Sequence, residues 1–196
     1  MSAPYEILAG PATIWLAAAN TAEVAVDTTP GVSWTKLGTS GSDNYNEDGI
    51  TVTHDQNIEG FRALGTTGMR KVWRTEEEFT IELTLHDLTL EHYKRALNGN
   101  SITTTAAGVG TPGSKSMNVL KGQSVELHAL LLRTESQSPY GDSFNAQFWM
   151  PVCFQSDSPE VVFNKGEAAG LKLTFTALED STNGFGVYRA QTAAAS

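Results

Sequence analysis

Apolar and polar residues alternate along most of this 196-residue chain, and this period of two restricts its fold more than any other feature. Successive side chains of a β-strand point to opposite faces, so alternation predicts strands with one buried face. The clearest alternating segments are residues 79–85, 125–132, 144–154 and 171–177, and shorter ones are residues 12–18, 32–37, 50–54 and 69–74. The chain is therefore predicted to be mainly β, with two packed sheets or a barrel and the apolar faces turned inward.

The segment 144–154 carries the longest alternation. Its apolar face is predicted to contain Phe144, Ala146, Phe148, Met150, Val152 and Phe154. Cys153, the single cysteine, falls out of phase with this face, between Val152 and Phe154. A single cysteine forms no intramolecular disulfide, and we interpret Cys153 as a structural residue rather than a nucleophile.

One segment has helical spacing instead. Leu90, Tyr93 and Leu97 recur at intervals of three and four, which places them on one side of a helix. Thr89 can cap its N-terminus and Gly99 can end it. The sequence therefore predicts one short helix at about residues 89–98, docked on the sheets because so short a helix is marginal alone.

Composition bounds the remaining possibilities. The apolar share of 40% supports a packed core, and the length suits a single domain over residues 1–196. The formal net charge of −9 argues against direct binding of nucleic acid, because binding phosphates requires cations. The first residues lack the features of a signal peptide, and no apolar stretch approaches the ~20 residues that span a bilayer. We therefore expect no membrane insertion and a protein made in a reducing cytoplasm.

Residues 38–75 form a long excursion, in which the segment 57–68 follows neither period. Irregular spans of this length are uncommon in compact domains unless they are functional or order against a partner. The span contains Ile58, Phe61 and Leu64, apolar side chains with no predicted core to enter. We predict a long loop that contacts neighbouring subunits through these three residues. A flexible tail is predicted at about residues 190–196.

Several short motifs have simpler explanations than the chemistry that they resemble. Residues 108–113 read G-x-G-x-x-G, but no buried strand and amphipathic helix flank them, so a hairpin tip is predicted. Asn44, Asn46 and Asp48 resemble half of a calcium loop, but position twelve is Asp55 and a strand pattern follows. We interpret this segment as a solvated turn.

The residues give no support for catalysis. The four histidines lack zinc-ligand spacing, and no nucleophile elbow or spaced triad occurs. We expect no enzyme activity, no catalytic residues, no metal site and no cofactor. The carboxylates of Glu76, Glu77 and Glu78 open a predicted strand, and they form either a solvated strand end or a surface that repels polyanions.

The order of these elements resembles the tail tube protein, or major tail protein, of long-tailed bacteriophages. The resembling segments are GPATIWLAAANT at 10–21, WTKLG at 34–38, NEDGITVTHDQNIEGFRALG at 46–65, TEEEFTIELTLHDLTLEHYKRALNG at 75–99, SVELHALLLR at 124–133 and FWMPVCFQSDSPEVVFNKGEAAGLKLTFTALED at 148–180. The resemblance covers roughly residues 10–190 and lies in pattern and order rather than in one motif. It implies a β-sandwich or half-barrel with one flanking helix, a fold related to that of type VI secretion tube proteins.

The resemblance also implies an assembly. Six copies would form a ring, inner strands would close into a barrel around a lumen, and stacked rings would form a tube through which DNA passes unbound. It implies contacts with tail tip, tape-measure and tail-terminator proteins, a place in the virion tail, and assembly in the host bacterial cytoplasm. An acidic bore would repel DNA at close range. Our candidates for lumen-facing acidic residues are Glu76, Glu77, Glu78, Glu82 and Glu126.

Two other classes of function stay open from the residues. A β-sandwich module that decorates a virion and recognises carbohydrate or a host surface would display aromatic side chains on one flat face. Four tryptophans are available for such a face: Trp15, Trp34, Trp73 and Trp149. They lie in separate strand-like segments, where core or interface packing is the commoner use. An enzyme is the third class, with no motif in its favour.

Overall fold

The computed structural model describes residues 10–38, 44–134, 136, 138–141, 143–166 and 168–194. Within these residues the elements are β1 (Ala12–Ala18), β2 (Thr35–Lys36), β3 (Tyr45–Phe61), β4 (Lys71–Leu85), α1 (Leu90–Leu97), β5 (Ile102–Thr105), β6 (Ser114–Met117), β7 (Leu127–Thr134), β8 (Ala146–Gln155), β9 (Leu171–Ala177) and β10 (Val187–Ala190). The predicted mainly β fold with one short helix is confirmed.

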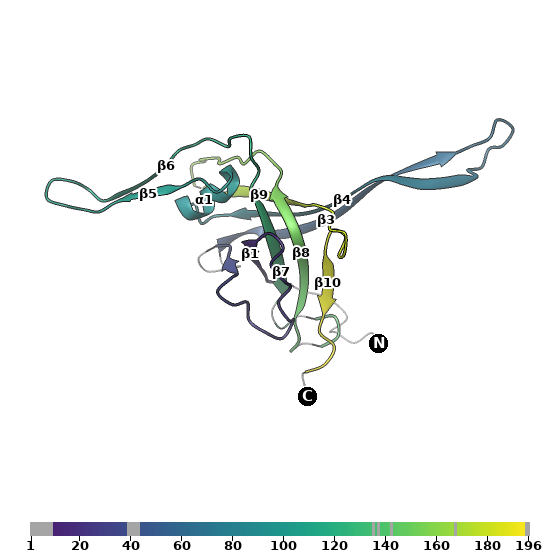
Figure 1. The fold of residues 1–196 in the computed structure, drawn as a ribbon, viewed down its shortest axis with the longest axis horizontal. Helices are drawn as coiled ribbons and strands as arrows, with labels where there is room; N and C mark the ends of the chain where they lie inside the picture. Colours follow the sequence, from purple (N-terminus) through teal and green to yellow (C-terminus); the bar gives the residue numbers. More distant parts are fainter. Residues whose placement is uncertain are drawn as a thin grey trace.

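The main sheet is antiparallel and open. Its strand order is β2-β1-β7-β8-β9-β4-β3, with β10 paired to β8 beside this path, and β5 and β6 form a separate hairpin. Strands β1, β7, β8 and β10 run across β3, β4 and β9, so that the sheet bends over itself (Figure 1). The result is a half-barrel rather than a closed barrel, as predicted.

The main hydrophobic core lies between the two crossing halves of this sheet. Leu130 and Met150 come from one half, and Leu83, Leu173 and Phe175 come from the other. All five side chains are almost completely buried. Fully burying a side chain of this kind contributes about 1.5–3 kcal/mol, so the crossing holds the two halves together.

A second, smaller cluster covers the opposite side of β1, β7 and β8. It contains Trp34, Leu131 and Trp149, over which the segment 20–34 folds. Two buried polar side chains fasten that segment: Arg133 donates to the carbonyls of Thr28 and Ala25, and Gln147 donates to the carbonyl of Val24. This face of the sheet is therefore covered by the chain itself.

The predicted alternation of residues 144–154 is wrong after Met150. Leu130 pairs with Met150 but His128 pairs with Cys153, so β8 has one extra residue between these pairs. Pro151 lies at this bulge, one of the few places where a strand accommodates proline. Because the bulge changes the phase, Cys153 joins Met150 in the main core, and Val152 and Phe154 do not. Cys153 is buried, as a structural residue should be.

The helix forms where the spacing predicted it. Thr89 caps it by accepting a hydrogen bond from the backbone of His92, and Asn98 ends it in the left-handed conformation (φ 99°), followed by Gly99. Leu97 is buried and Tyr93 packs against the main core. Docking thus stabilises a helix that is too short to be stable alone.

Individual strands were predicted unevenly. Residues 12–18 and 171–177 match β1 and β9, but only two residues of 32–37 are in a strand. Strands β5, β6 and β10 were not predicted. Residues 106–113 connect β5 to β6, so the predicted hairpin tip is confirmed.

The predicted long loop at residues 38–75 is wrong in its conformation. Residues 39–43 lie outside the described residues, but most of the rest belongs to β3 and to the beginning of β4. These strands pair continuously from Ile50–Leu83 to Phe61–Lys71, apart from one bulge. The long excursion is a β-hairpin.

Candidate assembly surfaces

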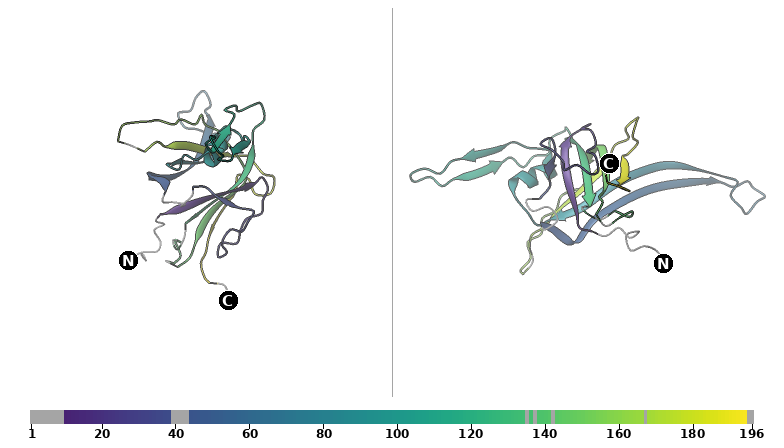
Figure 2. Two further views of the ribbon diagram at one scale, coloured as in Figure 1. Left: turned by 90° about the vertical axis from the view of Figure 1, so that its left-hand side faces the viewer. Right: turned by 90° about the horizontal axis from the view of Figure 1, so that it is seen from below.

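The hairpin of β3 and β4 extends well beyond the rest of the sheet. Strand β9 pairs with β4 only from Thr80 to Leu85, so within the described residues no third strand pairs with residues 55–78. We call these residues the arm and the remainder of the sheet the body. The arm projects from one side of the body and the β5–β6 hairpin from the opposite side (Figures 1 and 2). A two-stranded ribbon is marginally stable alone, so the arm depends on the body or on a partner.

Opposed residues of an antiparallel pair share a face, which divides β3, β4 and β9 into two surfaces. The core face carries Ile81 and Leu83 into the main core. The outer face points away from that core and carries Glu82, opposite Thr51 and Thr174. A bulge between Asn57 and Ile58 separates the base of the arm from its tip, which we define as residues 58–74.

Hydrogen bonds brace the arm on its core face. Glu77 contacts His54 (Oε1 to Nε2, 2.6 Å) and accepts a bond from Arg74 (3.1 Å), which also donates to Gln56 (2.9 Å). The hydrogen bond from His54 is the largest influence on the pKa of Glu77 and lowers it. Because all these groups are exposed, the network positions the arm more than it stabilises the fold.

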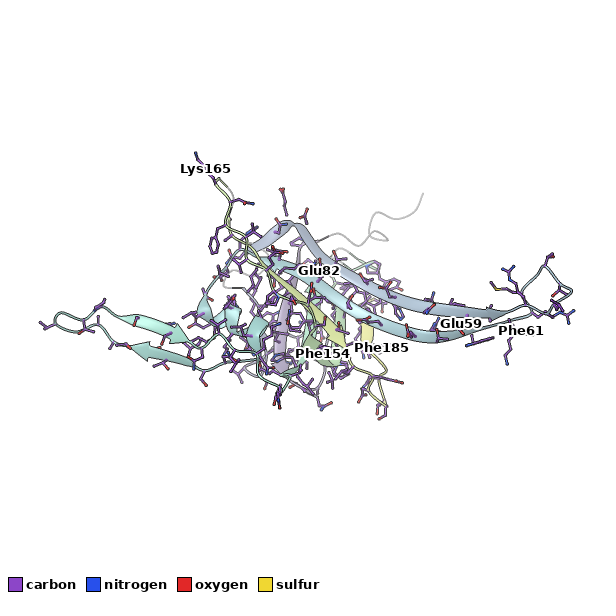
Figure 3. All side chains as sticks on the ribbon, turned by 90° about the horizontal axis from the view of Figure 1, so that it is seen from above. Glu59, Phe61, Glu82, Phe154, Lys165 and Phe185 are labelled. Carbon is purple, nitrogen blue, oxygen red and sulfur yellow. The ribbon has the colours of Figure 1, made fainter. Side chains whose placement is uncertain are left out.

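The three predicted interface residues lie together at the tip. Ile58 and Phe61 are each 54% exposed, and Leu64 is fully exposed in the connection between the strands. Figure 3 shows Phe61 far out along the arm. Met69, Val72 and Trp73 are exposed on the same tip, although the sequence did not assign them to this contact surface. Monomeric proteins rarely expose so concentrated an apolar group, so the tip is a candidate contact surface.

The five acidic candidates do not form one surface. Glu76, Glu78 and Glu82 lie on the outer face, and Figure 3 shows Glu82 over the body. Glu82 pairs with Lys172 (3.1 Å). Glu77 lies on the core face, one residue out of phase with the other three. Glu126 lies beside the helix, near Arg95 (3.7 Å) and His128 (3.4 Å).

A groove lies against the core face of β3, where this strand begins. It encloses about 560 Å³, and its lining includes the apolar residues Pro11, Ile50, Leu132, Phe148 and Tyr188. The rings of Phe148 and Tyr188 stack at 4.4 Å between centroids. Two exposed carboxylates, Glu47 and Asp48, belong to the same lining, which contains no lysine or arginine.

Strand β3 also leaves one edge open. It is the last strand in the order of the main sheet, so in the described part of the chain only β4 pairs with it. With 17 residues and no proline it is a long edge, and unpaired edges invite pairing with other chains. A soluble monomer would keep such an edge short or covered.

The described part of the chain has no group of three or more His, Cys, Asp or Glu side chains that could hold a metal ion. Burial raises the pKa of the Cys153 thiol, so this group is a poor nucleophile. Within the described ranges no helix is long and apolar enough to cross a bilayer. The tryptophans form no shared platform, because Trp34 and Trp149 are buried and Trp73 is on the arm.

Comparison with known proteins adds one finding. The sequence matches the family described as phage tail tube protein over residues 2–188. No curated protein matches it.

Proposed function

Because the chain belongs to the phage tail tube protein family, we propose that its copies assemble into stacked hexameric rings that conduct DNA during ejection. The chain is a structural protein of the virion tail. The finer proposal is that it self-assembles in the host cytoplasm and contacts the tail tip, tape-measure and tail-terminator proteins.

The observation that carries this proposal is the open edge of β3. A 17-residue edge continued into an exposed apolar tip has no use in a monomer. We propose that the arm of one copy docks on the body of the next, which is a head-to-tail contact. Such contacts close into rings when the rotation permits and otherwise continue as helices.

We further propose that the outer face of β3, β4 and β9 lines the lumen. The opposite outside of the body, over β1, β7 and β8, is already covered by residues 20–34, whereas the outer face presents carboxylates and threonines. Six copies would carry a formal charge of −54, six times −9. Carboxylates at the bore would keep DNA phosphates from adhering, because no counterions would be released by contact.

Electron microscopy with negative staining, together with sedimentation over a concentration series, tests the assembly. The wild-type protein should form rings or tubes, seeded where nucleation is slow. In an armless variant, an Asn-Gly turn should join Asp55 directly to Glu78, since this dipeptide suits a two-residue hairpin. This variant should keep a cooperative thermal melt and remain monomeric. Discrete wild-type monomers at every concentration, even after seeding, would contradict the proposal and favour a decoration module.

A further inference from the structure

Charge is unevenly distributed between the tip of the arm and the rest of the chain. Residues 58–74 contain the cations Arg62, Arg70, Lys71 and Arg74 and one carboxylate, Glu59, which gives a formal charge of +3. Since the whole chain carries −9, the other residues together carry −12. The tip is therefore the basic part of an acidic protein.

Most of these cations have no acidic partner within the described residues. Arg74 is engaged by Glu77, but Arg62 donates only to the carbonyl of Thr67, and neither Arg70 nor Lys71 forms an ion pair. Exposed apolar side chains, among them Phe61 and Met69, lie beside them. The tip thus combines an apolar surface with unpaired positive charge.

The groove at the beginning of β3 has the complementary composition. Its walls are apolar and aromatic, and its charged groups are the carboxylates of Glu47 and Asp48. Asp48 accepts a hydrogen bond from Asn46, and neither carboxylate pairs with a cation in the part of the chain that the structure describes. A volume of about 560 Å³ falls in the range of pockets that enclose drug-sized ligands, so it can admit one or two side chains.

We propose that the tip of one copy docks in this groove of a second copy, with its apolar side chains on Phe148 and Tyr188 and its cations against Glu47 and Asp48. The inference rests on the proposed function, because it assigns the receiving surface of the subunit contact. Within one molecule the extended arm carries its tip away from the body (Figure 1), so the contact joins two copies.

A competing receiver is the acidic outer face. It offers Glu76 and Glu78, but its other positions are polar, such as Thr80 and Thr176. Docking there would pair the cations and leave Phe61 and Met69 against polar groups. The groove offers apolar walls to the apolar side chains of the tip and carboxylates to its cations. We therefore assign the groove, and not the outer face, as the receiving surface.

Complementary charge also sets how the contact forms. Opposite patches steer copies into register and accelerate association, and salt weakens this attraction. Raising the salt from about 0.1 M to about 1 M shortens the Debye length from about 10 Å to about 3 Å. Assembly of the wild-type protein should therefore slow at high salt, although apolar burial persists.

Charge reversal tests the assignment. Arg70→Glu/Lys71→Glu reverses the tip, and Glu47→Lys/Asp48→Lys reverses the groove. Each double variant should keep the wild-type melt, because all four side chains are exposed, and each should raise the concentration needed for assembly at least tenfold. The quadruple variant should recover assembly. An equimolar mixture of the two double variants should also assemble, because each tip can then dock in a groove of opposite charge on the other variant.

The matched control moves the compensating charges to the outer face. Arg70→Glu/Lys71→Glu combined with Glu76→Lys/Glu78→Lys should stay unassembled. Recovery in this variant would overturn the groove in favour of the outer face. Assembly of the wild-type protein without recovery in the quadruple variant would overturn the groove and leave the proposed function intact. Wild-type protein that never assembles would contradict both the groove assignment and the proposed function.

Cross-linking supplies an independent readout. A zero-length carbodiimide reagent applied to wild-type tubes should join Lys71 to Glu47 or Asp48 of a second copy, identified by mass spectrometry. Mixed isotope labelling of two protein batches distinguishes links between copies from links within one. Links from Lys71 to Glu76 or Glu78 of another copy, without links to the groove, would contradict the proposal.

Discussion

The two halves of strand β4 have the same extended conformation, but one lies in the body and the other is exposed on the arm. Residues 79–85 lie between β3 and β9, with Ile81, Leu83 and Leu85 in the main core. Residues 71–78 pair with β3 alone and are all exposed. The inner half therefore contributes to the stability of the monomer. The outer half presents exposed apolar groups, which we propose that a second copy covers.

This difference shows that the alternation of side chains corresponds to two different environments within one strand. In the inner half it separates a core face from a polar outer face. In the outer half, Val72 and Trp73 are adjacent and lie on opposite faces, so both faces carry exposed apolar groups. Folding of the monomer buries the first set, and we propose that assembly buries the second.

The largest expected effect is on folding. Leu83→Ala should lower the free energy of unfolding by about 2–5 kcal/mol, because it leaves a cavity in a packed core. Val72→Ala, on the outer half of the same strand, should change it by less than about 0.5 kcal/mol. Denaturant titration followed by circular dichroism measures both. Equal losses for the two variants would mean that the arm is part of the folding core.

The next effect is on assembly without folding. Phe61→Asp should raise the concentration at which tubes appear by at least about tenfold, which corresponds to about 1.4 kcal/mol per contact. The circular-dichroism melt should stay unchanged, since this ring is 54% exposed. Val32→Asp, an equally drastic change at an exposed residue of the segment 20–34, should spare the tubes. If Phe61→Asp abolished the melt, Phe61 would belong to the core.

A smaller effect concerns the bore. Tubes of Glu78→Lys should bind short duplex DNA at low salt and release it at about 1 M salt, because lysines displace phosphate counterions. Asp27→Lys makes the same change of charge on the covering segment and should leave DNA unbound. Fluorescence anisotropy of labelled DNA measures both. DNA binding by the Asp27 variant alone would place the lumen on the other side of the body.

The smallest effect is a dependence of stability on pH that belongs to the body. Burial lowers the pKa of His128, nearby Arg95 lowers it further, and Glu126 partly offsets both. The folded state therefore resists protonation, and its free energy of unfolding should fall as the pH drops below about 6.5, the usual pKa of histidine.

One variant isolates this contribution. His128→Gln should flatten the fall in stability between about pH 6.5 and pH 5. Urea titrations at a series of pH values report the slope. An unchanged slope in His128→Gln would assign the pH dependence to other groups.

Sequence reasoning succeeded where one face of a strand is buried. Strands β1 and β9 were predicted to the residue because their apolar positions are in the core. Strands β5 and β6 were missed because threonine and serine dominate them and most of their residues are exposed. Residues 50–54, just before the arm, and 69–74 within it were recognised, but residues 55–68 carry polar groups on both faces and resemble a loop. The bulge at Pro151 was missed because alternation was carried through it.

The candidate surfaces, too, could be predicted from the sequence only in part. Ile58, Phe61 and Leu64 were identified because apolar side chains without periodicity need an external partner, and the structure places them together at the tip. Whether they contact a neighbouring subunit remains a prediction. The complementarity of Lys71 and Asp48 could not be found from the sequence, since it depends on which surfaces lie beside an apolar groove.

The order of strands in the main sheet has a consequence for how a newly made chain folds. Strands β3 and β4 are neighbours in sequence, and hairpins close within about 1–10 μs. The body closes late, because Ala12 pairs with Thr134, 122 residues further along. Such distant pairings slow folding. The β3–β4 hairpin therefore pairs transiently before the body closes, and an incompletely folded chain already presents its longest open edge. We expect the yield of native protein to fall steeply with expression rate, as nascent chains meet through β3 before β7 has closed the core.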